Sequence, residues 1–161
     1  MSKSPSRQRG QAMVEFALVL PIMMLVIVGI LEASRLVFMY ASVVNASREG
    51  SRYGSAYGLN DANIPRYKDC AGIRAAAQRV AFLIGSNATV TITYDHGPGT
   101  SVFDTCNGDT DAAVDLQTSD RIIVKVDANY SPMTPLIPLS SRTITSTSIR
   151  TVIGVMSIHP H

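Results

Sequence analysis

The residues of this sequence that could perform catalysis are few and scattered. Its histidines are His96, which precedes Gly97 and Pro98, and the C-terminal pair His159 and His161. No phosphate-binding glycine loop, nucleophile elbow or HExxH zinc motif is present. A histidine beside Gly and Pro is typical of a turn rather than of a general base. The sequence therefore predicts a protein that is not an enzyme and that uses no cofactor.

Oxygen-bearing side chains gather in a segment that we expect to be a loop, residues 97–119. Such side chains are the ligands that Ca²⁺ prefers. Their spacing lacks the bidentate Glu and the fixed Gly of an EF-hand, so a solvated acidic loop is favoured over a calcium site. The weak candidate ligands are Asp104, Asn107, Asp109, Asp111 and Asp115.

Two cysteines, Cys70 and Cys106, are expected to form one disulfide. An oxidising compartment favours such a bond, and a later region rich in Thr, Ser, Asn and Gly is typical of an exported domain. The chain-entropy model gives about 3–4 kcal/mol for closing the long loop between them. Two unpaired buried thiols are the alternative.

Glu15 is a carboxylate at the start of an apolar run. A charge at the centre of a membrane costs about 2.5–3.5 kcal/mol, and less near the edge. One interpretation is an interfacial carboxylate favoured by the helix macrodipole. The other is a partner with a positive charge inside the membrane or an assembly. Pro21 lies in the same run and should kink or loosen a helix there, because it removes one backbone hydrogen bond.

The element that must position Glu15 is an uncharged segment from Phe16 to Leu31. As a helix it spans about 24 Å, and extending it to residues 12–34 matches a bilayer core of about 30 Å. A cleaved secretory signal fits the basic start of the chain but not the charged residues that follow. A buried core helix would need apolar surface that the rest of the chain lacks. A membrane anchor is therefore the preferred interpretation.

The basic residues Lys3, Arg7 and Arg9 precede this segment, so the positive-inside rule places the N-terminus in the cytoplasm and the rest of the chain outside. Beyond the segment the helical pattern continues to the low 50s, first facing lipid and then half-buried. The apolar stripe that predicts burial there is Leu36, Val37, Tyr40, Val43 and Val44.

The rest of the chain predicts a small α+β domain with one helix on a three-stranded antiparallel sheet. The helix is expected to begin after Asp69 as N-cap and to end at Gly85. The strands are expected at residues 88–94, 121–130 and 142 to about 157, from their alternating or Thr-rich patterns. The formal net charge is only +2 and no basic run occurs, which excludes a nucleic-acid partner.

Three pieces of the N-terminal third occur in order and at a specific spacing. Residues 9–17 read RGQAMVEFA and include Glu15 and Phe16, Pro21 follows, and residues 45–53 read NASREGSRY. Together they resemble the TadE/TadG-like family of the tight-adherence (Flp) pilus system, whose members are type IV pilin-like minor subunits. The last piece resembles the family's A-x-R-E-G-x-R helix end, carried here by Arg48, Glu49, Gly50 and Arg52.

The resemblance implies cleavage by a prepilin peptidase between Gly10 and Gln11. Glu15 would then be the fifth residue of the mature chain, and it would pair with the new amine of a neighbouring subunit. Glu15, Phe16 and Pro21 are thus expected to act in assembly. The implied partners are other pilin-like subunits, the pilus assembly platform and the lipid bilayer. The implied location is the bacterial cytoplasmic membrane, with incorporation into surface pili.

The expected organisation is a leader (residues 1–10), a pilin-like helix (11–58) and an extracytoplasmic α+β domain (59–161). Two alternatives remain open beside a minor pilin or pseudopilin that takes part in pilus assembly for surface attachment. One is an uncleaved, membrane-anchored binding or scaffold module. The other is a major filament subunit, which the helix alone does not distinguish from a minor one.

Overall fold

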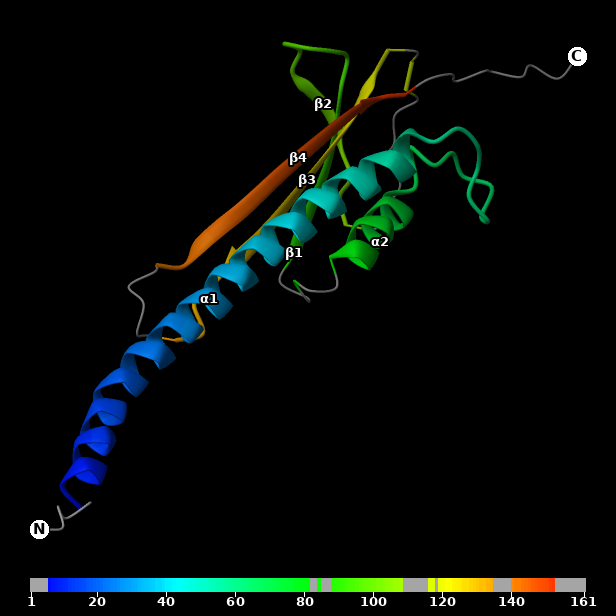
Figure 1. Cartoon of the computed structure of the whole chain (residues 1–161). Helices are drawn as coiled ribbons and strands as arrows, with labels where there is room; N and C mark the ends of the chain where they lie inside the picture. Colours follow the sequence, from blue (N-terminus) through cyan, green and yellow to red (C-terminus); the bar gives the residue numbers. More distant parts are fainter. Residues whose placement is uncertain are drawn as a thin grey trace, which may run out of the picture.

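The computed structural model of the chain describes residues 6–81, 84, 88–108, 116–117, 119–134 and 140–152. Figure 1 shows one helix as a long rod, with its N-terminal half clear of the rest and its C-terminal half against the sheet. The elements within these residues are α1 (Ser6–Ser55), α2 (Cys70–Val80), β1 (Ala88–Asp95), β2 (Val102–Thr105), β3 (Arg121–Tyr130) and β4 (Arg142–Thr151).

The long helix α1 divides into an exposed half and a packed half. Residues 10–27 are all exposed, and the helix continues without a break through Pro21. From Glu32 onward one face of α1 is buried. The buried positions recur at the three- and four-residue spacing of a helix face. They are Glu32, Met39, Ser42, Val43, Ala46, Ser47, Gly50, Ser51 and Gly54.

The stripe that the sequence predicted to be buried in this half of α1 is mostly exposed. Val37 and Tyr40 are 65% and 59% exposed, and of the five predicted residues only Val43 lies in the core. The buried face consists instead mainly of Ser, Ala and Gly. Small side chains let the helix axis approach the sheet closely, so packing at this surface outweighs hydropathy in selecting the face.

The sheet is antiparallel with strand order β2-β1-β3-β4, so the predicted three strands are four. β1 and β3 pair over eight positions, from Ala88 opposite Ala128 to Asp95 opposite Arg121. The additional strand, β2, lies inside the segment predicted to be a loop. It is only four residues long and pairs with the end of β1 beside a bulge at Tyr94 and Asp95. This strand depends on its tertiary contact with β1, so no alternating pattern in the sequence indicated it.

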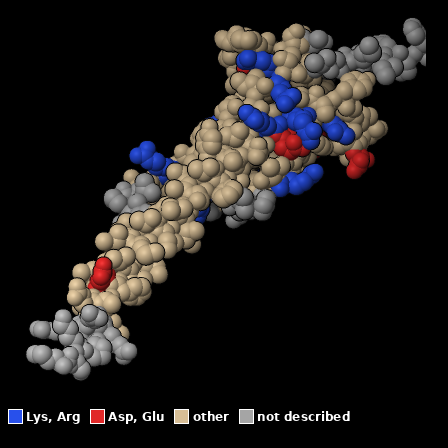
Figure 2. Space-filling model, viewed as in Figure 1, with Lys and Arg blue, Asp and Glu red and all other residues tan. Residues whose placement is uncertain are grey.

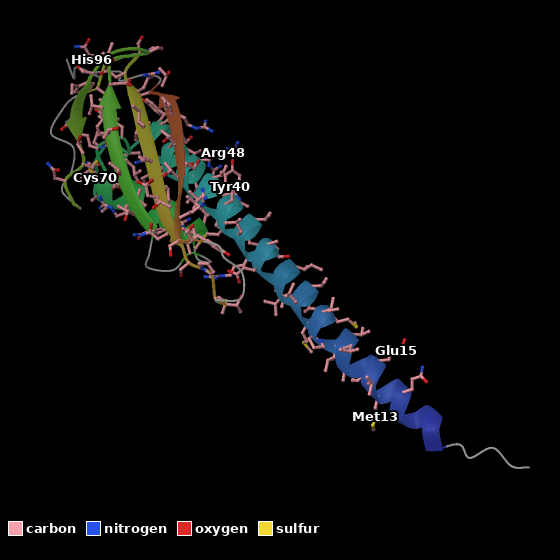
Figure 3. The ribbon with its side chains drawn as sticks, turned by 90° about the vertical axis from the view of Figure 1, so that its left-hand side faces the viewer. Met13, Glu15, Tyr40, Arg48, Cys70 and His96 are labelled. Atoms are coloured by element: carbon pink, nitrogen blue, oxygen red, sulfur yellow. A yellow bond between two sulfur atoms is a disulfide. The ribbon has the colours of Figure 1, made fainter. Side chains whose placement is uncertain are left out.

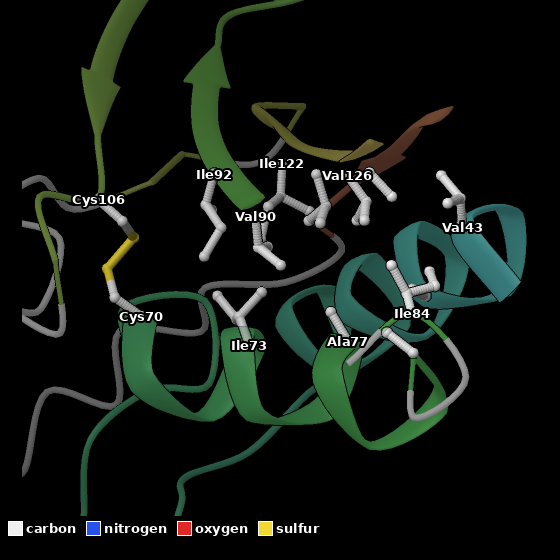
Figure 4. Packing of buried hydrophobic residues seen from close by; sticks show 14 of the residues in the cluster. Val43, Cys70, Ile73, Ala77, Ile84, Val90, Ile92, Cys106, Ile122 and Val126 are labelled. Atoms are coloured by element: carbon white, nitrogen blue, oxygen red, sulfur yellow. A yellow bond between two sulfur atoms is a disulfide. The ribbon is translucent and has the colours of Figure 1, made fainter. Parts of the chain in front are cut away.

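The core lies between one face of the sheet and the two helices (Figure 4). The alternation of β1 and β3 predicted this face correctly, since Ile92, Ile122 and Val124 are fully buried. The predicted end of the helix α2, at Gly85, lies too far along the chain. Helix α2 ends at Val80, where Ala81 caps it through bonds to the carbonyls of residues 77 and 78. Strand β4 ends at Thr151, and the predicted continuation from residue 153 lies outside the described residues.

Candidate functional site

The residues expected to act in processing and assembly lie on the exposed half of α1. Gly10, Gln11, Glu15, Phe16 and Pro21 are all exposed. Glu15 carries the only charge between residues 10 and 31. Figure 3 shows its side chain projecting from the helix, away from the folded domain. The structure therefore leaves this carboxylate on an apolar surface, within reach of another molecule.

Gly10 is not required by the packing of this chain. A Cβ built on it, or on Gly29 in the same exposed half, meets nothing within 4 Å. Glycine inside a helix is less favourable than Ala by about 1 kcal/mol. A glycine at position 10 therefore has no structural benefit in the folded chain described here.

Gly50 and Gly54, in the packed half of α1, are the opposite case. A Cβ on Gly54 would lie 2.3 Å from Cδ1 of Ile122, and one on Gly50 would lie 3.1 Å from Cγ1 of Val124 and 3.2 Å from Cβ of Ala77. These glycines let α1 contact the sheet and α2 directly. Glycine weakens a helix on its own, but here both glycines allow the core to close.

Two serine pairs join the same face of α1 to the edge strand. The hydroxyl of Ser47 lies 3.0 Å from that of Ser146, and the hydroxyl of Ser51 lies 2.8 Å from that of Ser148. All four are thereby partnered where helix and sheet meet. Each helix serine also donates to a carbonyl three residues earlier.

The charged residues of the predicted helix-end motif lie on the other side of α1. Arg48 and Arg52 are exposed, and Arg52 binds both carboxylate oxygens of Glu49, at 2.7 and 3.0 Å. Hydrogen bonding by Arg52 holds the pKa of Glu49 below its usual range. Gly50 thus serves the core, while the three charged residues face outward, where another molecule can contact them.

A polar junction ties the start of the packed half of α1 to the end of β3. Glu32 is 5% exposed, and one of its carboxylate oxygens accepts from the hydroxyl of Tyr130 and from the backbone N–H of Met133, the latter at 3.2 Å. Arg35, one turn further, donates to the carbonyl of Ser131 at 2.9 Å and lies 3.5 Å from Glu32. Its guanidinium also lies 5.4 Å from the centre of the Tyr130 ring.

This junction was not predicted from the sequence, in which Glu32 is simply one of the charged residues that follow the apolar run. The one available signal in the sequence was a carboxylate at the end of the apolar run. Exposure to solvent would be enough to account for a carboxylate at that position. The structure instead buries Glu32 in the domain. The folded unit therefore begins at Glu32, although apolar side chains on the other face of α1 stay exposed as far as Tyr40.

A second polar centre and a disulfide hold the opposite end of the domain. Asp69 accepts from Tyr53 of α1 at 2.7 Å, from Asn60 at 2.8 Å and from the N–H of Gly72 in α2 at 2.7 Å. Burial opposes the charge of Asp69, but these bonds outweigh it and lower the pKa. The next residue, Cys70, is joined to Cys106 in a disulfide that connects α2 to the segment after β2.

The remaining candidates do not form a metal centre in the part of the chain that the structure describes. No group of three His, Cys, Asp or Glu residues there could hold a metal ion. Asp104 belongs to β2 and Asn107 follows it, while Asp109, Asp111 and Asp115 lie outside the described residues. His96 stacks on Phe103, with ring centroids 4.0 Å apart, and Nδ1 lies 2.9 Å from Asp120. These contacts join the turn after β1 to β2 and to the start of β3.

Among the described residues, one helix is long and apolar enough to cross a membrane, and it covers residues 10–55 of α1. The same part of the chain carries the exposed Glu15 and the two close-packing glycines. Residues 10–52 match the family model described as TadE-like protein. This part of the chain is TadE-like. The match confirms the resemblance that the sequence indicated.

The TadE-like segment ends within α1, so it includes Glu32 and both halves of the helix but not α2 or the sheet. Neither the curated proteins nor the solved structures gave a match to the chain. The Tyr130 side of the junction lies outside the TadE-like segment.

Proposed function

We propose that the chain is a single-pass membrane protein that acts as a minor pilin-like subunit in the assembly of a tight-adherence pilus. The N-terminus lies in the cytoplasm and the α+β domain lies outside. The leader is removed between Gly10 and Gln11 by a prepilin peptidase. The protein works by contact with other pilin-like subunits and the assembly platform, and not by catalysis.

The observation that carries this proposal is the TadE-like match over residues 10–52 of a helix whose N-terminal half the domain leaves uncovered. Figure 2 shows its surface from the N-terminal end to the domain almost free of charge, with one acidic patch near the end. A helix that only tethered a domain would need neither Glu15 nor a glycine at position 10. Both fit a helix that is processed and then packs beside other helices.

Processing is tested by the mass of the protein from its native membrane. The mature chain should begin at Gln11, and Gly10→Leu should leave a precursor about ten residues longer, because a bulky residue blocks cleavage. Gly29→Leu is the matched control, since that glycine also has open space around it. Its chain should be cleaved normally. Native protein that retains residues 1–10 beside an active prepilin peptidase would contradict processing and favour the uncleaved scaffold.

The role of Glu15 is tested by Glu15→Gln in a strain that lacks the native protein. The variant should insert, because a neutral side chain enters the membrane more easily, and the domain should fold. Co-purification with other pilins and piliation should fall at least tenfold, because the partner amine is left unpaired. Asp61→Asn, an exposed carboxylate of the domain, is the control. Normal piliation in the Glu15→Gln strain would show that Glu15 is only an interfacial residue and does not act in assembly.

Abundance distinguishes the proposed minor subunit from a major one. Sheared pili should contain this chain at a small fraction of the main subunit. A chain that makes up most of the sheared filament would instead be the major subunit.

A further inference from the structure

Asn107 and Gly108 follow the disulfide at Cys106 and belong to neither a helix nor a strand. They are the one place in the sequence where an asparagine precedes a glycine. An asparagine amide can form a ring with the backbone nitrogen of the next residue, and glycine favours this reaction because it has no Cβ to crowd the ring. The contacts of the two residues decide whether the reaction occurs in the folded chain.

The fold leaves both reacting groups free. Asn107 and Gly108 are exposed. Within the described part of the chain, no hydrogen bond involves the side-chain amide of Asn107 or the backbone N–H of Gly108. Gly108 has a φ of 63°, in the left-handed region that favours glycine, and a Cβ built on it would meet nothing within 4 Å. The amide of Asn107 can therefore turn toward the nitrogen of Gly108 without breaking a contact of the fold.

Two other asparagines of the domain show the opposite arrangement. Asn60 donates from Nδ2 to Asp69 at 2.8 Å, and its Oδ1 accepts from two backbone N–H groups at 3.0 and 2.9 Å. Asn129 lies in β3, where its Oδ1 accepts from the hydroxyl of Thr143 at 2.8 Å. Each of these amides would have to give up hydrogen bonds in order to reach the following backbone nitrogen.

We propose that Asn107 is a site of spontaneous covalent modification, which converts it to a mixture of aspartate and isoaspartate. The backbone nitrogen of Gly108 loses its proton to water and attacks Cγ of Asn107. A C–N bond forms, the bond from Cγ to the amide nitrogen breaks, and that nitrogen takes up a proton and leaves as ammonia. Water then opens the resulting five-membered succinimide ring at one of its two carbonyls. The reaction consumes one water and releases one ammonia, without an oxidant or a cofactor.

The surroundings confine the consequence to one side of the modified bond. Cys106 is 8% exposed, its N–H donates to the carbonyl of Ile92 at 3.1 Å, and its side chain is joined to Cys70 (Figure 4). Opening of the ring to isoaspartate adds a methylene group to the main chain after this anchor. Either product adds a negative charge to a segment that already has four aspartates between residues 104 and 115. The modification should therefore change the charge of this segment and leave the core and the disulfide intact.

The test incubates the purified full chain in detergent at neutral and at mildly alkaline pH and follows each asparagine by peptide mapping. Asn107 should be converted, with isoaspartate detected by an isoaspartyl methyltransferase, while Asn60 and Asn129 keep their amides. The rate should rise with pH, because the attacking nitrogen must lose its proton. Conversion in the native chain should be nearly as fast as in the urea-unfolded chain, since the fold leaves the pair free.

Two variants test the chemistry. Gly108→Ala should slow the conversion about tenfold, because a Cβ crowds the ring that forms. Asn107→Gln should remove the isoaspartate signal, because its longer side chain does not form the five-membered ring. The wild-type chain should keep its free energy of unfolding and its disulfide after conversion.

Each other outcome overturns part of the inference in a distinguishable way. A native rate far below that of the unfolded chain would show that the fold protects the pair. Conversion of Asn60 and Asn129 as fast as that of Asn107 would show that free groups do not select the site. An unchanged rate in Gly108→Ala would refute attack by the backbone nitrogen. None of these results depends on the membrane placement or on processing, so the inference stands or fails separately from the proposed function.

Discussion

At the scale of single residues, the glycines of α1 separate two kinds of requirement. Gly54 is enclosed by Ile122 and Ile73, whereas Gly10 and Gly29 have open space around them. A hydropathy pattern treats all of these positions alike. The fold needs Gly54, because its surroundings leave no room for a side chain. The fold does not need Gly10 or Gly29, so any requirement for these two glycines comes from contacts with other molecules.

Gly54→Ala should therefore destabilise the domain, although alanine favours helix formation. The added methyl group meets the side chain of Ile122, and overpacking of this kind costs about 1–3 kcal/mol. Chemical unfolding of the detergent-solubilised chain, followed by near-ultraviolet circular dichroism, measures the change. Gly29→Ala is the control and should be neutral or slightly stabilising. Equal stability of the two variants would show that the contact of α1 with β3 is looser than described.

At the scale of elements, β1 and β3 are joined at one end by a buried ion pair. Asp95 accepts from Nε and Nη2 of Arg121 at 2.7 and 2.5 Å and from the N–H of Gly97 at 3.2 Å. Hydrogen bonding by Arg121 is the main cause that lowers the pKa of Asp95, against the opposing effect of burial. A lowered pKa in the folded state stabilises the fold above the unfolded value of about 3.9.

The domain should accordingly lose stability as the pH falls from about 5 through the folded pKa of Asp95. Asp95→Asn should be less stable near neutral pH, because Arg121 loses its partner. It should also lose less free energy of unfolding on acidification than the wild type does. The measurement is urea unfolding at a series of pH values, with Asp61→Asn as the exposed control. An unchanged pH profile in Asp95→Asn would show that the ion pair contributes nothing to acid sensitivity.

The sequence predicted those elements whose own pattern specifies them. Alternation gave β1 and β3 with the correct inward faces, and Asp69 was correctly placed as the N-cap of α2. The sequence pattern failed where the structure of a segment depends on a residue or strand far along the chain. Strand β2 exists through its pairing with β1, and Glu32 is buried by Tyr130, 98 residues later. It also failed where small residues pack, because a face of Ser, Ala and Gly carries little hydropathy.

At the scale of the whole molecule, the junction at Glu32 decides how the domain sits on its helix. Tyr130→Phe removes one donor to a buried carboxylate and should cost about 1–3 kcal/mol. The effect should appear as faster hydrogen exchange at residues 131–134, next to the lost bond, with the exchange of α2 unchanged. Tyr40→Phe, an exposed tyrosine of the same helix, serves as control. Protection of 131–134 equal to that of the wild type would show that Met133 and Arg35 hold the junction without Tyr130.

The continuity of α1 has a mechanical consequence. No loop separates the exposed half of the helix from the half that packs on the sheet, so in the proposed placement the domain is the far arm of a lever whose near arm lies in the bilayer (Figure 1). From Glu32 to Ser55 this arm measures about 35 Å. A change in helix tilt of about 10° would therefore swing its far end by about 6 Å. The helix and the domain therefore move as one body when the helix leaves the membrane, and a force applied to either part acts on the other.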